Sequence, residues 1–197
     1  MTVALDFTPI VLTRLLFALA LLMAQASTAA ESRLFPPAPG AALEWRAIND
    51  GVMGGVSQGG FEITRDGRLV FAGVVSLENS GGFASVRSEP ARIGAAAAQA
   101  VRLEVRGDGK RYKLNLKTDA AFDGVQYQAA FVAPAGEWTT LTLPLAAFAP
   151  KHRGRDVPDA PPLDAARIVT LGFLISDRQA GPFRLEVRAI DLVGDLR

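Results

Sequence analysis

The sequence has 197 residues, of which 49% are hydrophobic and 21% are charged, and its formal net charge is +1. Its 21 basic and 20 acidic residues balance, which excludes the basic excess typical of a nucleic-acid-binding protein. Cysteine is absent and His152 is the one histidine, so disulfide frameworks, thiolate zinc sites, cysteine nucleophiles and imidazole metal clusters are excluded.

The N-terminal segment has the order of a secretory signal peptide. Arg14 precedes the apolar run 15–24, and the small residues of 26–30 follow it. The run is shorter than the roughly 20 residues that a membrane-spanning helix needs. We therefore expect residues 1–30 to be a cleaved signal peptide and the protein to be exported to the periplasm. The alternative is an uncleaved anchor, in which case the leader alone contacts the membrane.

Proline-rich residues 31–42 predict a stiff, poorly ordered lead-in, and residues 43–197 a single domain. In that domain residues 101–106 and 111–117 alternate apolar and polar side chains. The side chains placed inward by this alternation are Val101, Leu103, Val105, Tyr112, Leu114 and Leu116. The Asp-Gly dipeptide between the two segments favours a tight turn. We predict that the two strands pair as a hairpin.

Further short strands follow along the chain. They are predicted at residues 68–76, 82–88, 125–132, 138–143, 168–176 and 183–187. Proline-rich residues 149–162 predict a long surface loop, and Asp164 is placed to cap one helical turn at 164–167. Many short half-buried strands with little helix predict an all-β fold, an antiparallel β-sandwich or jelly roll.

The first distinctive segment is the glycine-rich stretch 49–57. Its glycines permit sharp turns, and Asn49, Asp50 and Ser57 add side-chain donors and acceptors. The stretch lacks the Lys-Ser/Thr ending of a phosphate-binding loop. Two interpretations remain open: a binding segment, or a crossing where the chain passes close to a neighbouring strand.

The second distinctive segment is 78–87, which places Phe83, Ser85 and Arg87 on one strand face. An arginine in this position lies exposed at a rim or pairs with a carboxylate, and Asp50 is the natural partner. Such a pair would serve either the structure or ligand recognition. The outward stripe Arg111, Lys113 and Lys117 would hold an anionic partner or form a solvated strand face.

Catalytic alternatives find little support. Four acidic residues lie in predicted loops: Asp50, Glu78, Asp123 and Asp177. Glycoside hydrolysis would require two of them to face each other across a cleft. His152 lies among cations in Lys151-His-Arg-Gly-Arg155, a setting that argues against a Ser-His-acid site. Three aromatic residues offer faces for sugar rings, although strand aromatics more often belong to a core or rim: Trp45, Tyr127 and Trp138.

Taken together, these segments resemble the complex I intermediate-associated protein 30 family. The resemblance runs from about residue 43 to the end, and it is most specific in Met-Gly-Gly-Val-Ser (53–57) combined with Gly-Gly-Phe-Ala-Ser-Val-Arg (81–87). It implies a galactose-binding-like jelly roll, similar to some carbohydrate-binding modules. The best-known members are chaperone-like assembly factors for respiratory complex I without established catalytic residues.

We therefore predict a non-catalytic binding or assembly protein, without cofactor or metal, that acts in the cell envelope on a protein partner such as a respiratory-complex subunit or assembly intermediate. The alternative is a carbohydrate-binding module with a glycan ligand. The first predicted set of partner-binding residues is Asn49, Asp50, Ser57 and Arg87. The second is Asp108, Tyr112, Asp177 and Gln179.

Overall fold

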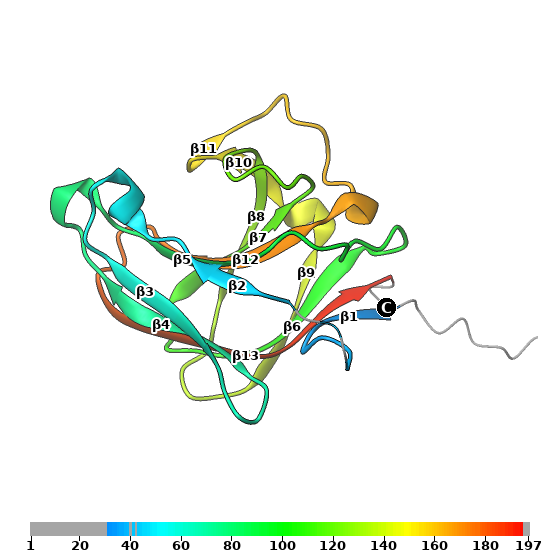
Figure 1. The fold of residues 1–197 in the computed structure, drawn as a ribbon, viewed down its shortest axis with the longest axis horizontal. Helices are drawn as coiled ribbons and strands as arrows, with labels where there is room; N and C mark the ends of the chain where they lie inside the picture. The colour runs from blue at the N-terminus through cyan, green and yellow to red at the C-terminus, as the bar shows by residue number, and fades with distance from the viewer. Residues whose placement is uncertain (1–30, 40, 42, 195–197) are drawn as a thin grey trace, which may run out of the picture.

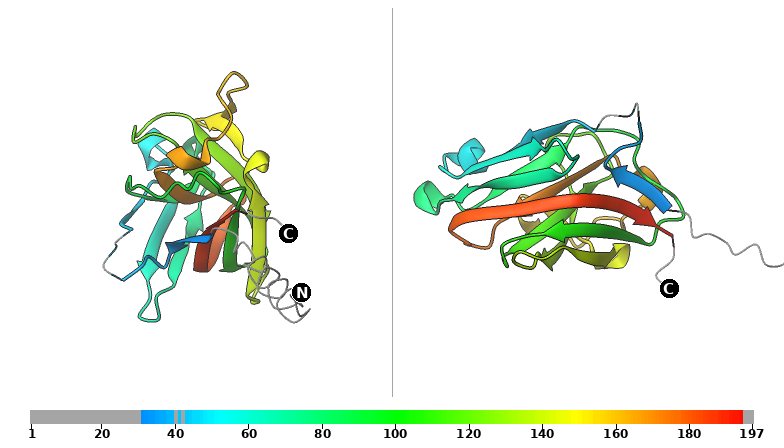
Figure 2. Two further views of the ribbon diagram at one scale, coloured as in Figure 1. Left: turned by 90° about the vertical axis from the view of Figure 1, so that its right-hand side faces the viewer. Right: turned by 90° about the horizontal axis from the view of Figure 1, so that it is seen from below.

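The computed structural model describes residues 31–39, 41 and 43–194. This part of the chain forms two antiparallel sheets packed face to face (Figures 1 and 2). The prediction of an all-β antiparallel sandwich is confirmed. Within the described ranges no helix is long and apolar enough to cross a membrane. The predicted leader, residues 1–30, lies outside the described residues.

The first sheet has six strands, in the order β3-β4-β13-β6-β9, with β1 beside β13. Its members are β1 (Glu31–Phe35), β3 (Gln58–Ile63), β4 (Leu69–Val75), β6 (Ala100–Arg106), β9 (Thr139–Pro144) and β13 (Gly181–Val193). The long β13 forms the middle of this sheet. Its first half pairs with β4, and its second half pairs with β1 on one side and β6 on the other.

The second sheet has seven strands, in the order β11-β10-β8-β7-β12-β5-β2. Its members are β2 (Trp45–Ala47), β5 (Ala84–Ser88), β7 (Arg111–Lys117), β8 (Gln126–Val132), β10 (Ala149–His152), β11 (Arg155–Asp156) and β12 (Thr170–Ile175). Short 3₁₀ helices lie in the connections: η1 (Asp50–Met53), η2 (Glu78–Ser80), η3 (Leu145–Ala147) and η4 (Ala165–Arg167). As predicted, the Asp164 carboxylate caps η4, because it accepts a hydrogen bond from the Ala166 N–H at 3.0 Å.

The core fills the space between the two sheets. The six side chains that alternation placed inward are all fully buried, which confirms the predicted inward face. The predicted outward stripe is wrong at Lys117, which is 2% exposed and pairs with Asp119 at 3.3 Å. Aromatic rings pack along the inner face of the seven-stranded sheet, with Trp45 stacked 6.5 Å from Phe173, and Phe35 of β1 contacts Trp45 across the layers at 6.2 Å between ring centroids. Trp45 and Tyr127 are therefore core side chains, with 8% and 3% of their surface exposed, and not sugar platforms.

The predicted hairpin of residues 101–106 with 111–117 is wrong, since β6 lies in the six-stranded sheet and β7 in the seven-stranded sheet. The turn between them crosses from one sheet to the other. There the Gly107 N–H donates to the Pro134 carbonyl at 2.8 Å, and a Cβ on Gly107 would lie 2.4 Å from that of Ala133. Both strands turn their apolar faces to one core, so a crossing satisfies the same alternation as a hairpin.

Other differences lie at the sheet edges. The first residues of the predicted lead-in form β1, which pairs with β13 and buries Phe35. The predicted loop 149–162 contains the β10–β11 hairpin. Strands β2 and β3 were not predicted, and β13 continues to Val193, beyond the expected 183–187. Strands β1, β2, β3, β10 and β11 are short, which weakens their periodic signal, and a register shift between Val187 and Ala189 interrupts the alternation of β13.

Candidate binding cleft

The two glycine-rich segments meet at the buried carboxylate of Asp50. Its oxygens accept hydrogen bonds from the Ser57 N–H at 2.9 Å, the Ser57 hydroxyl at 2.5 Å, the Gly82 N–H at 2.7 Å and the Phe83 N–H at 3.2 Å. Burial alone would raise the pKa of Asp50, but these hydrogen bonds lower it below its usual value. The carboxylate is ionised and joins two loops that are distant in sequence.

The glycines around Asp50 are required by close approach. A Cβ on Gly55 would lie 2.4 Å from the Asp50 carboxyl carbon, and one on Gly81 would lie 2.6 Å from a carboxylate oxygen. Asn49 contributes a further tie, since its side-chain N–H donates to the Gly59 carbonyl at 2.9 Å. Of the two interpretations of residues 49–57, this geometry favours the structural crossing.

The predicted pairing of Asp50 with Arg87 does not occur. Four donors from neighbouring loops already surround the Asp50 carboxylate, whereas Arg87 projects from the outward face of β5. The Arg87 guanidinium donates to the Phe122 carbonyl at 3.2 Å and lies over the Phe122 ring, 5.1 Å from its centroid. The first predicted set is therefore divided, and Arg87 is the member that lines a cleft.

Most of the second predicted set fixes turns. The buried Tyr112 hydroxyl donates to Asp108 at 3.0 Å, and Asp108 accepts the Arg184 N–H at 2.9 Å. Burial raises the pKa of Tyr112 well above its usual range. Gln179 exchanges two hydrogen bonds with the Arg111 backbone, at 3.0 and 2.7 Å. None of these three predicted residues lines the cleft.

Asp177 is placed differently, because it reaches the cleft through an ion pair with Lys113 at 2.7 Å. The hydrogen bond from Lys113 is the main cause that lowers the pKa of Asp177.

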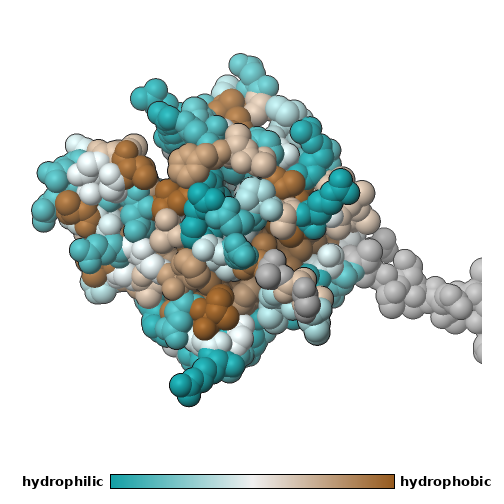
Figure 3. Space-filling model, viewed as in Figure 1, coloured by the Kyte–Doolittle hydropathy of each residue, from teal (hydrophilic) through white to brown (hydrophobic). Residues whose placement is uncertain are grey.

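The cleft lies on the outward face of the seven-stranded sheet and has a volume of about 580 Å³. Figure 3 shows a notch on this side, between the lobe that carries η1 and the lobe that carries β10 and β11. The floor is a row of residues in register across four strands: Arg87, Gly172, Asn115 and Gln128. This volume falls in the range of roughly 300–1,000 Å³ that is usual for ligand sites.

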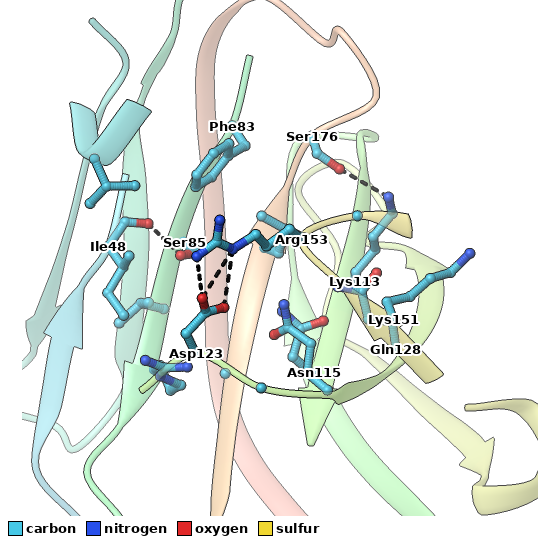
Figure 4. A pocket seen from close by; sticks show the side chains of 18 of the residues that line it. Ile48, Phe83, Ser85, Lys113, Asn115, Asp123, Gln128, Lys151, Arg153 and Ser176 are labelled. Carbon is cyan, nitrogen blue, oxygen red and sulfur yellow. Dashed lines mark hydrogen bonds and ion pairs between the residues drawn. The ribbon is translucent and has the colours of Figure 1, made fainter. Parts of the chain in front are cut away.

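The two walls of the cleft differ in chemistry. One wall is apolar, with Val52 and Met53 of η1 and Phe122 each exposing more than half of their surface, at 67%, 66% and 61%. The other wall is the β10–β11 hairpin, from which Arg153 reaches toward Asp123 above Asn115 and Gln128 (Figure 4). Arg153 and His152 both contact Asp123, and the hydrogen bond from Arg153 chiefly lowers the pKa of that carboxyl to about 2.

This arrangement suits binding better than acid–base chemistry. The pKa values of Asp50, Asp123 and Asp177 are all lowered, so these carboxyls are ionised and none is prepared to act as a general acid. In the described ranges no group of three or more His, Asp or Glu side chains is placed to hold a metal ion.

Sequence reasoning missed Asn115, Gln128, Gly172 and Phe122. The one available signal was an amide at an outward strand position, at Asn115 and again at Gln128, but the pairing of β7 with β8 that joins them was unknown.

The sequence model of complex I intermediate-associated protein 30 (CIA30) matches residues 37–187. The chain belongs to the CIA30 family. The mitochondrial protein of that name from Mus musculus is 31% identical over 97 residues, which cover 47% of this chain and 30% of the mouse protein. The Drosophila melanogaster protein is 30% identical over 101 residues, which cover 47% of this chain and 33% of the fly protein. The chain thus matches about a third of the length of these relatives.

Solved structures share the fold of this CIA30 family member. The family 11 carbohydrate-binding module of the cellulase Lic26A-Cel5E of Clostridium thermocellum aligns with a TM-score of 0.64 at 16% identity, over 87% of this chain and 98% of the module. The same module in complex with a mixed-linked β-1,3-1,4 tetrasaccharide aligns with a TM-score of 0.62 at 16% identity, over 87% of this chain and 99% of the module. The predicted galactose-binding-like jelly roll is confirmed.

Proposed function

We propose that this protein is a non-catalytic, chaperone-like assembly protein that holds a protein partner in the cleft. The observation that carries the proposal is the cleft itself, a hollow on the outward sheet face with an apolar wall and a polar floor. Membership of the CIA30 family supports an assembly role, because the relatives are named after an association with complex I intermediates.

Separate observations support the proposed compartment and the proposed partner. The signal-peptide pattern of residues 1–30 favours action in the cell envelope. A subunit or assembly intermediate of a respiratory complex is the partner that the family name supports. The exposed side chains of Val52, Met53 and Phe122 suit this role, since adjoining exposed apolar side chains are typical of surfaces that bind other proteins.

Site-directed photo-crosslinking in the native host tests this proposal. A photoreactive phenylalanine analogue is placed at Phe122, on the cleft wall, or at Phe61, which is 38% exposed on the edge strand β3. We expect a reproducible adduct from position 122, identified by mass spectrometry as a respiratory-complex component, and none from position 61. Well-expressed protein that gives no adduct at 122, or the same adducts at both positions, would refute the assignment of the cleft.

Glycan binding is the second candidate function. The shared fold and the two floor amides, Asn115 and Gln128, favour it, because amides hydrogen-bond well to sugar hydroxyls. The aromatic residues weigh against it. Trp45 and Tyr127 belong to the core. The ring of Trp138 is covered by Arg106 and Arg188, whose guanidinium carbons lie 5.0 and 4.0 Å from the ring centroid. A glycan array on which the purified protein binds nothing would exclude this function.

A further inference from the structure

The cations of the cleft are unequally paired. Lys113 contacts Asp177 at 2.7 Å, Lys151 contacts Asp156 at 2.5 Å, and Arg153 contacts Asp123. Arg87 forms no ion pair with any residue in the described ranges. Its contacts are the Phe122 carbonyl at 3.2 Å and the Phe122 ring. A guanidinium has five N–H donors, so most donors of Arg87 are free to bind a ligand.

The surroundings of Arg87 favour an anion. Burial, and next the nearby charge of Arg46, lower the pKa of Arg87, whereas the charge of Glu89, which is itself paired with Arg46, raises it. An arginine that is partly removed from water without a directly paired carboxylate is electrostatically under-compensated. A carboxylate fits this need best, because it accepts two parallel hydrogen bonds from one guanidinium.

Next to Arg87 the floor of the cleft has a position without a side chain, Gly172, followed by the polar side chain of Asn115. Gly172 lies in register between Arg87 and Asn115 and leaves no side chain above the sheet there. Asn115 is 8% exposed, and its buried Oδ1 lacks a hydrogen-bond donor among the described residues. A buried acceptor without a donor is costly. A ligand that lies above Gly172 could donate an N–H to the Asn115 Oδ1 and at the same time accept hydrogen bonds from the Arg87 guanidinium.

From these features we propose that the cleft binds an extended acidic peptide segment of the partner, with one carboxylate of that segment seated on Arg87. This inference rests on the proposed function, because it concerns the same cleft. The floor crosses four strands, from β5 to β8, and strands lie about 4.8 Å apart, so it is roughly 14 Å long. About four residues of extended chain have this length.

The apolar wall completes the selection of a peptide. A segment along the floor presents alternate side chains to opposite sides, so every second residue can pack against Val52, Met53 and Phe122. A peptide backbone also supplies N–H donors for the Oδ1 of Asn115, which is unpaired among the described residues. An acidic sugar would satisfy Arg87 but would find no tryptophan or tyrosine ring among the residues that line the cleft.

Selection from a random 12-residue phage-display library tests the proposal. The baits are the wild-type protein, Arg87→Gln, Arg87→Lys and, as the matched control, Arg65→Gln, which removes an exposed arginine from the β3–β4 turn. We expect wild type and Arg65→Gln to select peptides that share one Asp or Glu position, Arg87→Lys to retain part of that preference, and Arg87→Gln to lose it.

Affinity measurements by fluorescence polarisation then use the selected peptide and its Asp→Asn or Glu→Gln counterpart. On the wild-type protein the neutral peptide should bind about tenfold or more weakly, since a hydrogen bond to a charged group is lost. On Arg87→Gln the two peptides should differ less than about twofold. The wild-type comparison needs no protein variant, so it remains decisive even if Arg87→Gln fails to fold.

Three results would overturn the inference: selected peptides without an acidic position, equal binding of the acidic and neutral peptides to wild type, or Arg87-dependent binding of acidic glycans without binding of peptides. Crosslinking at position 122 separates this inference from the function on which it rests. A respiratory-complex adduct there, together with selected peptides that lack an acidic position, refutes the acidic segment alone. Absence of both adduct and selected peptides refutes the two together.

Discussion

The Asp50 carboxylate should be the most sensitive single position in the loops of this protein. Asp50→Ala removes the acceptor of three backbone N–H groups, those of Ser57, Gly82 and Phe83, while the Ser57 hydroxyl keeps the Ser76 carbonyl at 3.2 Å. Each buried donor left without an acceptor costs about 1 kcal/mol or more. We expect the free energy of unfolding to fall by about 3 kcal/mol, a large share of the 5–15 kcal/mol typical of a domain.

Urea unfolding followed by tryptophan fluorescence measures this loss, because Trp45 is buried in the core. With a slope of about 2 kcal/mol per molar urea, the unfolding midpoint should fall by about 1.5 M. Asp50→Asn keeps one acceptor oxygen but turns an amide N–H toward Ser57. The unfolding midpoint of this variant should fall by about half as much as that of Asp50→Ala. The exposed Asp159→Ala is the control and should change stability by less than about 0.5 kcal/mol. A shift below about 0.5 M for Asp50→Ala, at an unchanged slope, would refute the structural role assigned to Asp50.

Three further predictions concern packing, hydrogen bonding and pH. Gly172→Ala places a Cβ 2.5 Å from the Val86 carbonyl oxygen, so thermal unfolding should show a loss of about 1–3 kcal/mol; unchanged stability would contradict the close strand contact. Tyr112→Phe removes the hydrogen bond to Asp108 and should cost about 1 kcal/mol in the same assay, whereas a neutral result would show the bond to be dispensable. The folded-state pKa values of Asp50 and Glu186 are lowered, so their contribution to stability is present above about pH 4 and is lost as the pH falls through the folded-state values. The urea midpoint should therefore fall between pH 5 and pH 3, and less steeply in Asp50→Asn; parallel curves would contradict the role of Asp50.

The hydrophobic alternation of the sequence predicts which side chains face the core, and it does so well at 101–106 and 111–117. Alternation carries no information on which strand lies beside which. The Gly107–Lys110 turn shows this limit, because an Asp-Gly dipeptide suits a crossing between two sheets as well as a hairpin within one. Pairing depends on contacts between distant segments, such as β7 with β12, and local sequence does not encode them.

The distinctive motifs predict the family and fold better than the binding surface. Asn49, Asp50 and Ser57 tie loops together by hydrogen bonds, and such ties demand specific small and polar residues. The floor of the cleft uses ordinary residues at outward strand positions, such as Gln128. Of the first predicted set, Arg87 is the residue that lines the cleft, although its expected partner Asp50 is bound elsewhere.

The positions of β12 and β13 in the two sheets constrain the order in which the protein assembles. The strand β12 separates β5 from β7, and β13 separates β4 from β6, yet both belong to the last part of the chain. A chain synthesised from its N-terminus therefore lacks the middle of each sheet until almost all of it has left the ribosome. Neither layer can close before these two strands are available, so the earlier strands remain without their central neighbours until β13 has been synthesised.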